Sequence, residues 1–150
     1  FAQVVLQSPE QVILKSLGEE KTIYRSDEFY NKTPKNLSQG FAIEFVFGVD
    51  YRHQDILFTD VIPTFKERIQ NTIKEKHEDL KESLGDLTIE FLQAGASSLD
   101  LRFFLKCSGN IASKKLFLMR SIQSEFVTVC NEKDYVIPFN QLTVHMEKNG

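Results

Sequence analysis

The sequence lacks several features that would place it in a common functional class. Its apolar runs are interrupted by charged residues such as Glu44, Arg102 and Lys106, far short of the roughly 20 residues that a helix needs to span a bilayer. A net charge of -3 gives no basic field that would attract nucleic acid or anionic lipid. These absences argue against a membrane span within the chain and against nucleic acid as a partner.

Cysteine and histidine are scarce and scattered. Cys107 and Cys130 fall at opposite ends of a predicted helix, on the order of 30 Å apart at 1.5 Å per residue, which is too far for a disulfide. The sequence has no CxxC, HExxH or GxSxG motif, so neither a zinc site nor an activated nucleophile is indicated. We interpret His53, His77 and His145 as solvated or structural. We therefore expect no metal, no cofactor and no catalytic residue, and hence no enzyme.

Length and composition predict a soluble globular fold. The 150 residues, 41% of them hydrophobic and 26% charged, suffice for one ordinary domain with a full core, alone or with a small neighbour. The chain opens on Phe1, and no charged segment followed by an apolar one resembles a signal peptide. We expect the chain to be a fragment of a longer protein.

The stretch from Phe41 to Val49 organises the rest of the chain. Its large apolar side chains fall on every second residue, the pattern of a half-buried strand. An amphipathic helix is predicted after it, between about Gln54 and Lys76. Because proline is tolerated only in the first turn of a helix, this helix either starts near Val61, with Pro63 in its first turn, or kinks at Pro63.

The later segments complete a recognisable order of elements. Alternating apolar residues predict strands over 87–91 and 99–107, joined through the small residues 95–97 into a hairpin. A second amphipathic helix is predicted over 111–131 and a last strand over 142–147. The order strand, helix, strand, strand, helix, strand predicts an α+β fold over 41–147, a ferredoxin-like βαββαβ sandwich. Its four-stranded, mostly antiparallel sheet would carry both helices on one face, with the first and third strands at its centre.

The N-terminal part predicts a separate small β unit. Three β-prone runs separated by turn residues occupy 1–37, as in a meander or the end of a small β barrel. The stretch from Ser26 to Gly40, rich in Asn, Ser, Lys and Pro, is interpreted as a linker or irregular crossing. We place the boundary near Pro34 to Gly40.

One face of the predicted ferredoxin-like sheet is polar, so we expect it to be exposed to solvent or to contact a polar partner. Glu44 and Arg102 would lie on neighbouring antiparallel strands, where a cross-strand ion pair is possible. An RNA-binding sheet would instead display several aromatic side chains in a basic surround, and only Phe104 is aromatic here. The polar residues of this face are Glu44, Glu90, Asp100, Arg102, Lys106, Thr143 and His145.

Three stretches of the chain resemble the sequence motifs of one protein family. FAIEFVFGVDY at Phe41–Tyr51, SLDLRFFLKC at Ser98–Cys107 and above all IPFNQLTVHM at Ile137–Met146 resemble the cytoplasmic part of the mechanosensitive channel of small conductance (MscS) family. Upstream, LGEEKTIYRSDEFYNKTPKNLS at 17–38 is similar to the end of that family's middle β domain.

The resemblance implies a subunit of a homo-oligomeric channel, a heptamer in this family, whose domains form a hollow cytoplasmic cage. Membrane tension would open the pore, and ions and small osmolytes would pass between cage domains, which protects the cell from osmotic stress. The parent protein would lie in the inner membrane through segments outside this chain. The residues alone leave a second class open, a soluble ferredoxin-like regulatory or small-molecule-binding module, although no Gly-rich phosphate cradle supports it.

Overall fold

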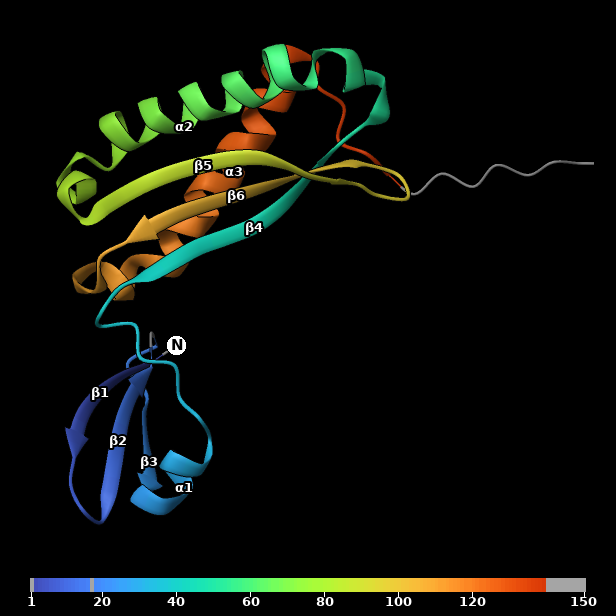
Figure 1. Cartoon of the computed structure of the whole chain (residues 1–150). Helices are drawn as coiled ribbons and strands as arrows, with labels where there is room; N and C mark the ends of the chain where they lie inside the picture. Colours follow the sequence, from blue (N-terminus) through green and yellow to red (C-terminus); the bar gives the residue numbers. More distant parts are fainter. Residues whose placement is uncertain (1, 17, 140–150) are drawn as a thin grey trace, which may run out of the picture.

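A computed structural model describes residues 2–16 and 18–139, which form an α+β structure with two antiparallel three-stranded sheets (Figure 1). The first sheet has the order β1-β2-β3 and the second the order β4-β6-β5. The elements, in chain order, are β1 (Ala2–Gln7), β2 (Gln11–Ser16), β3 (Lys21–Arg25), α1 (Ser26–Asn31), β4 (Phe41–Val49), η1 (Tyr51–Ile56), η2 (Leu57–Val61), α2 (Ile62–Lys76), η3 (Glu78–Ser83), β5 (Leu84–Ala94), β6 (Leu99–Cys107), η4 (Gly109–Lys114) and α3 (Lys115–Lys133).

The N-terminal sheet contains the three predicted strands, but the segment after them is not wholly a linker. Residues 26–31 form helix α1, so the interpretation of this part as irregular was wrong. The Ser26 hydroxyl donates to the carbonyl oxygen of Ser8 at 2.9 Å, and Asp27 and Glu28 lie in the first turn, where carboxylates are favoured by the helix dipole. These interactions hold a helix in which no residue is buried.

The second sheet confirms the predicted order of the first three ferredoxin-like strands. β6 lies between β4 and β5 and pairs antiparallel with both, in a register that sets Ile43 opposite Leu105 and Leu87 opposite Leu105. Every second residue of β6 from Leu99 to Cys107 is buried, as a strand with one covered face requires. The predicted last strand, 142–147, lies outside the described residues and stays a prediction.

Both predicted helices are present on one face of this sheet (Figure 1). α2 begins at Ile62 with Pro63 in its first turn, which confirms the first of the two expected starts and excludes a kink. Two further turns precede it: η1, a 3-10 turn whose N-cap is Asp50, and η2, a π turn. η4 similarly precedes α3, which runs two residues further than predicted.

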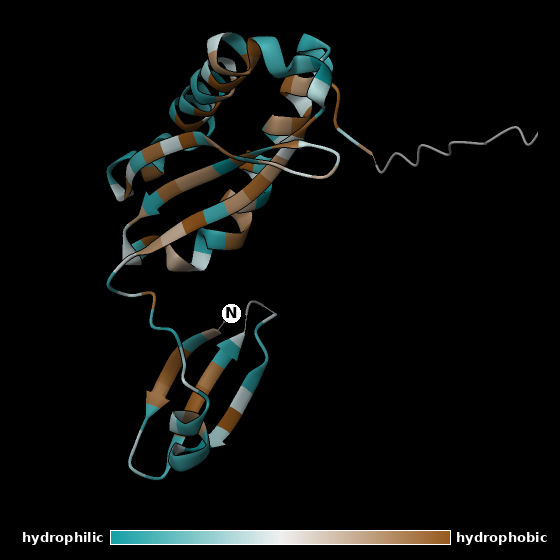
Figure 2. Ribbon diagram, turned by 45° about the vertical axis from the view of Figure 1, so that its right-hand side comes forward, coloured by the Kyte–Doolittle hydropathy of each residue, from teal (hydrophilic) through white to brown (hydrophobic). Residues whose placement is uncertain are grey.

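The core between sheet and helices is built around Phe126 of α3. Its ring centroid lies 4.5 Å from that of Phe65 on α2, 5.4 Å and 5.0 Å from those of Phe45 and Phe47 on β4, and 5.9 Å from that of Phe103 on β6. Edge-to-face and stacked pairs at these separations add to the effect of burial. Figure 2 shows the alternation of hydrophobic and hydrophilic residues along the strands that supply these rings.

The segment between the two sheets rests on the start of η4. A Cβ atom added to Gly109 would lie well inside contact distance of the Ser38 carbonyl oxygen and 2.8 Å from the carbonyl oxygen of Leu37. Gly40, just before β4, has φ +127, a conformation that residues with a Cβ rarely adopt. Glycine at these two positions therefore lets the chain pass closely over η4 and turn into β4.

Candidate functional site

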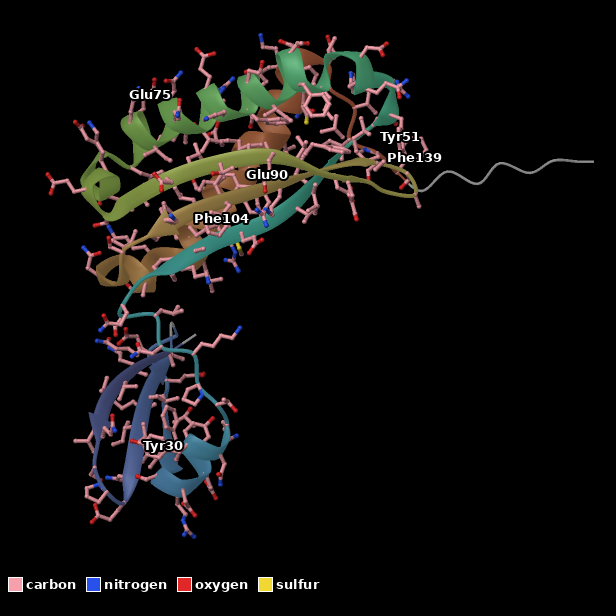
Figure 3. The ribbon with its side chains drawn as sticks, in the orientation of Figure 1. Tyr30, Tyr51, Glu75, Glu90, Phe104 and Phe139 are labelled. Carbon is pink, nitrogen blue, oxygen red and sulfur yellow. The ribbon has the colours of Figure 1, made fainter. Side chains whose placement is uncertain are left out.

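The candidate site is the sheet face that the helices leave uncovered, which we call the open face. Side chains of β4, β5 and β6 that alternate with the buried ones project from it, and Figure 3 shows Glu90 and Phe104 among them. The side chains of the open face include Glu44, Val46, Asp86, Thr88, Glu90, Asp100, Arg102, Phe104 and Lys106.

Arg102 is the centre of the open face. It stands directly opposite Glu90 in the register of β5 and β6, and its Nη2 forms an ion pair with that carboxylate. The Nη1 atom lies 3.9 Å from Glu44 on β4, which is the predicted cross-strand pair at the long end of its range. The sequence did not indicate the closer pairing with Glu90, because it depends on the register.

Charge on the open face is unevenly balanced. Lys106 lies 3.2 Å from Asp86 across the β5–β6 pair, and a depression of about 300 Å³ lies over this side of the sheet. The acidic residues Glu44, Asp86, Glu90 and Asp100 outnumber the basic residues Arg102 and Lys106 by four to two. The described part of this face therefore carries a net charge of -2, which favours hydrated cations over anions near it.

Neutralising Arg102 is expected to have a small effect on stability. Its side chain is 41% exposed and those of its two partners are 44% and 52% exposed, and exposed pairs contribute between about 0 and 1 kcal/mol. We expect Arg102→Gln to lower the free energy of unfolding by less than ~1 kcal/mol in urea titrations. The loss should shrink at 1 M salt, because salt screens exposed charges; a loss that is insensitive to salt would contradict this view of the pair.

A second polar cluster, absent from the sequence predictions, holds the segment that follows α3. We call it the exit clamp; it consists of Asp50, His53, Asp60, Tyr135 and Val136. The Tyr135 hydroxyl donates to Asp60 at 2.6 Å, and the pKa of Tyr135 is raised, first by burial and then by this carboxylate. The clamp joins residues more than 70 positions apart, so no local spacing could have indicated it.

His77, one of the three predicted structural histidines, is buried between α2 and α3. Its Nε2 lies 3.0 Å from the Ser121 hydroxyl, and its ring meets that of Phe117 edge-on. Burial, more than any neighbouring charge, lowers the pKa of His77. The structure thus places this histidine as a packing residue, whereas His53 belongs to the exit clamp and His145 lies outside the described residues.

The lowered pKa of His77 predicts weaker folding in acid. Its unfolded form takes up a proton more readily, so the free energy of unfolding decreases as the pH falls below about 6.5, by at most ~1.4 kcal/mol per pH unit for one proton. Urea midpoints at pH 7.5 and 5.5 should differ in that direction. His77→Gln should reduce the difference, and an unchanged difference in this variant would assign the acid sensitivity to other groups.

The described residues show no arrangement for metal binding or membrane spanning. No group of three or more His, Cys, Asp or Glu side chains among residues 2–16 and 18–139 could hold a metal ion. No helix in this part of the chain is both long and apolar enough to cross a bilayer. Cys107 and Cys130 are free and buried, and burial raises the pKa of each thiol to about 11, which leaves little reactive thiolate.

The architecture defines an α+β unit with a polar open sheet face, preceded by a small antiparallel sheet. It is similar to the crystal structure of MscS from Helicobacter pylori in the closed state, with a TM-score of 0.65 and 18% sequence identity. The match covers 99% of this chain and 55% of that chain. No family model and no curated protein matches the sequence. The likeness confirms, at the level of the fold, the resemblance to the MscS family.

Proposed function

We propose that this chain is the cage region of a small-conductance mechanosensitive channel. In this proposal residues 1–37 are the end of a middle β domain and residues 41–147 form the α/β domain. The observation that carries the proposal is the extent of the structural likeness, which includes both sheets and the segment between them rather than the α/β unit alone. A ferredoxin-like sheet by itself would support many functions.

The proposed assembly is a homo-oligomer, a heptamer by family resemblance, on the cytoplasmic side of the inner membrane. The parent protein would be held in that membrane by segments outside this chain, and the cage would pass ions and small osmolytes when tension opens the pore. The chain spans 55% of the length of the MscS chain to which it is similar. The chain would act as a passive wall element, with no catalytic, cofactor or metal residue.

The open face supports a role beside a permeation route. Its net charge of -2 and its partly exposed ion pairs form a hydrated surface without a site that would hold an ion tightly. A wall that binds weakly lets ions pass, because conduction requires that each binding step be easily reversed.

Osmotic rescue tests the proposal with the full-length parent. It would be expressed in a bacterial strain without mechanosensitive channels, and survival of sudden dilution would be counted beside tension-activated currents in membrane patches. The parent and its Phe117→Ala variant should restore survival, whereas Phe126→Ala, which removes the centre of the core, should not. Normal membrane insertion of the parent without rescue and without current would overturn the channel proposal.

The oligomeric state needs its own measurement. Chemical cross-linking of the full-length parent in native membranes should give a ladder of bands that ends at seven subunits. A ladder that ends at another number would overturn the heptamer while leaving the channel in place. A single monomeric band would count against the cage itself.

One observation favours the alternative, a soluble regulatory or small-molecule-binding module. The depression on the open face combines the cations Arg102 and Lys106 with carboxylates and the ring of Phe104, a set that could meet a zwitterionic solute. Thermal unfolding of the isolated chain with 10-fold dilution series of free amino acids distinguishes the two functions. We expect no shift in midpoint; a saturable rise that Arg102→Gln abolishes would favour the module.

A further inference from the structure

The segment 135–139, with which the chain leaves α3, is held at Tyr135, which is buried and donates to Asp60, and at Val136. The carbonyl oxygen of Val136 accepts a hydrogen bond from the backbone N–H of Asp50 at 3.0 Å, and the backbone N–H of Val136 donates to Nε2 of His53 at 2.8 Å. Pro138 then passes over Gly48 of β4, where a Cβ would come within 3.3 Å of its ring.

The bond to His53 exists in only one protonation state. An imidazole that accepts at Nε2 carries its single hydrogen on Nδ1, whereas an imidazolium carries hydrogen on both nitrogens and accepts at neither. Uptake of one proton from solvent would therefore set two N–H groups against each other at Val136. The bond is lost, and repulsion between two donors replaces it.

The surroundings of His53 offer the charged ring another partner. Asp50, on the same turn, is largely buried; its pKa is lowered first by the backbone N–H of Arg52, and attraction to His53 is among the smaller causes. The Nε atom of Arg52 also donates a hydrogen bond to Oδ1 of Asp50, at 3.2 Å. Two groups outside this turn also lie near His53. The ring centroid of Tyr135 is 5.6 Å from that of His53, and Asp60 accepts a hydrogen bond from the Tyr135 hydroxyl. No residue of 135–139 is basic.

We propose that His53 is a pH-sensitive latch that holds segment 135–139 against the α/β unit. When neutral, it accepts from the backbone N–H of Val136; when protonated, it faces the Asp50 carboxylate and leaves that N–H without its acceptor. Histidine side chains ordinarily change charge between about pH 5 and 8, and His53 is only partly buried, so protons reach it. The latch acts on the chain beyond Tyr135, whose bonds to Asp60 and Cys130 do not involve His53, and its effect is independent of the proposed channel function.

Hydrogen exchange at Val136 tests the latch in the whole chain. The protection factor of this amide, corrected for the intrinsic pH dependence of exchange, would be measured by NMR between pH 8 and pH 5. Protection in the wild-type chain should fall about tenfold or more, the change that 1.4 kcal/mol produces. The amides of Phe103 and Leu105 in β6 should keep their protection, which would show that the fold is intact.

Substitutions of His53 separate the latch from a general loosening. In His53→Gln the amide oxygen lies as many bonds from the backbone as Nε2 and accepts at every pH, so protection of Val136 should be independent of pH. In His53→Ala protection should be low at both pH values. The same fall in His53→Gln as in the wild-type chain, or a flat profile in the wild-type chain, would overturn the proposal. His77→Gln should retain the wild-type response, because that histidine does not contact the segment.

Discussion

Replacing Phe126 with alanine should lower the free energy of unfolding by about 3–5 kcal/mol, the range for deleting a buried aromatic ring. Phe126 is fully buried, and its ring contacts four others from β4, β6 and α2. Their positions are fixed by three different elements, so the cavity cannot collapse cheaply. Urea unfolding followed by far-ultraviolet circular dichroism gives the change, and the thermal midpoint should fall by roughly 6–20 °C.

The matched control for this prediction lies on the same helix. Phe117 of α3 is 64% exposed and makes its ring contact with His77, so Phe117→Ala should cost less than ~1 kcal/mol. Equal losses in the two variants would mean that helix propensity, not the aromatic core, decides the stability of this unit. A loss below ~1 kcal/mol for Phe126→Ala would contradict the packing described above.

Replacing Gly109 with alanine should cost about 1–3 kcal/mol, the usual range for forcing extra atoms into a packed site. The new methyl group would collide with the Ser38 carbonyl and approach that of Leu37. Because both obstacles are backbone atoms, no side-chain rotation can relieve them, and the linker must move. Urea unfolding measures the loss, and trypsin cleavage at Lys32 and Lys35 reports whether the linker lifts off η4.

Gly18 provides the control for Gly109. A Cβ at Gly18 meets its nearest neighbour, the Ser16 hydroxyl, at 3.8 Å, an ordinary contact, so Gly18→Ala should change stability by no more than ~0.5 kcal/mol. If Gly109→Ala leaves both the unfolding free energy and the trypsin rate unchanged, residues 37–38 do not rest on η4 in solution. The way the linker joins the two sheets would then need revision.

Some of the features behind these two predictions could be predicted from the sequence, and others could not. The bounds of β4 and β6 could be read from alternation alone, because burial on one face imposes a period of two on the chain. Pro63 limited α2 to two alternatives, a start just before it or a kink, and the structure decided for the first. The close approach at Gly109 could not be read, because a glycine looks the same in a loose turn and in a tight contact.

Helix α1 shows where periodicity gives no information. Its six residues bury no side chain, so no apolar stripe distinguishes them from a linker. The available signal was chemical rather than periodic, namely the two carboxylates Asp27 and Glu28 in the first turn of a short segment. The helix types of η1 and η2 could not be predicted for a related reason, since their hydrogen bonds are set by the route from β4 to α2.

The sequence by itself determined which residues form the covered and open faces of the second sheet, and which order of elements builds it. These properties follow from local periodicity, since each strand or helix must separate apolar from polar side chains by its own geometry. Only the tertiary structure decided that Arg102 meets Glu90 more closely than Glu44, and that His53 reaches Val136, 83 residues away. Register and loop path set such contacts, and they depend on the packing of the whole core rather than on any single segment.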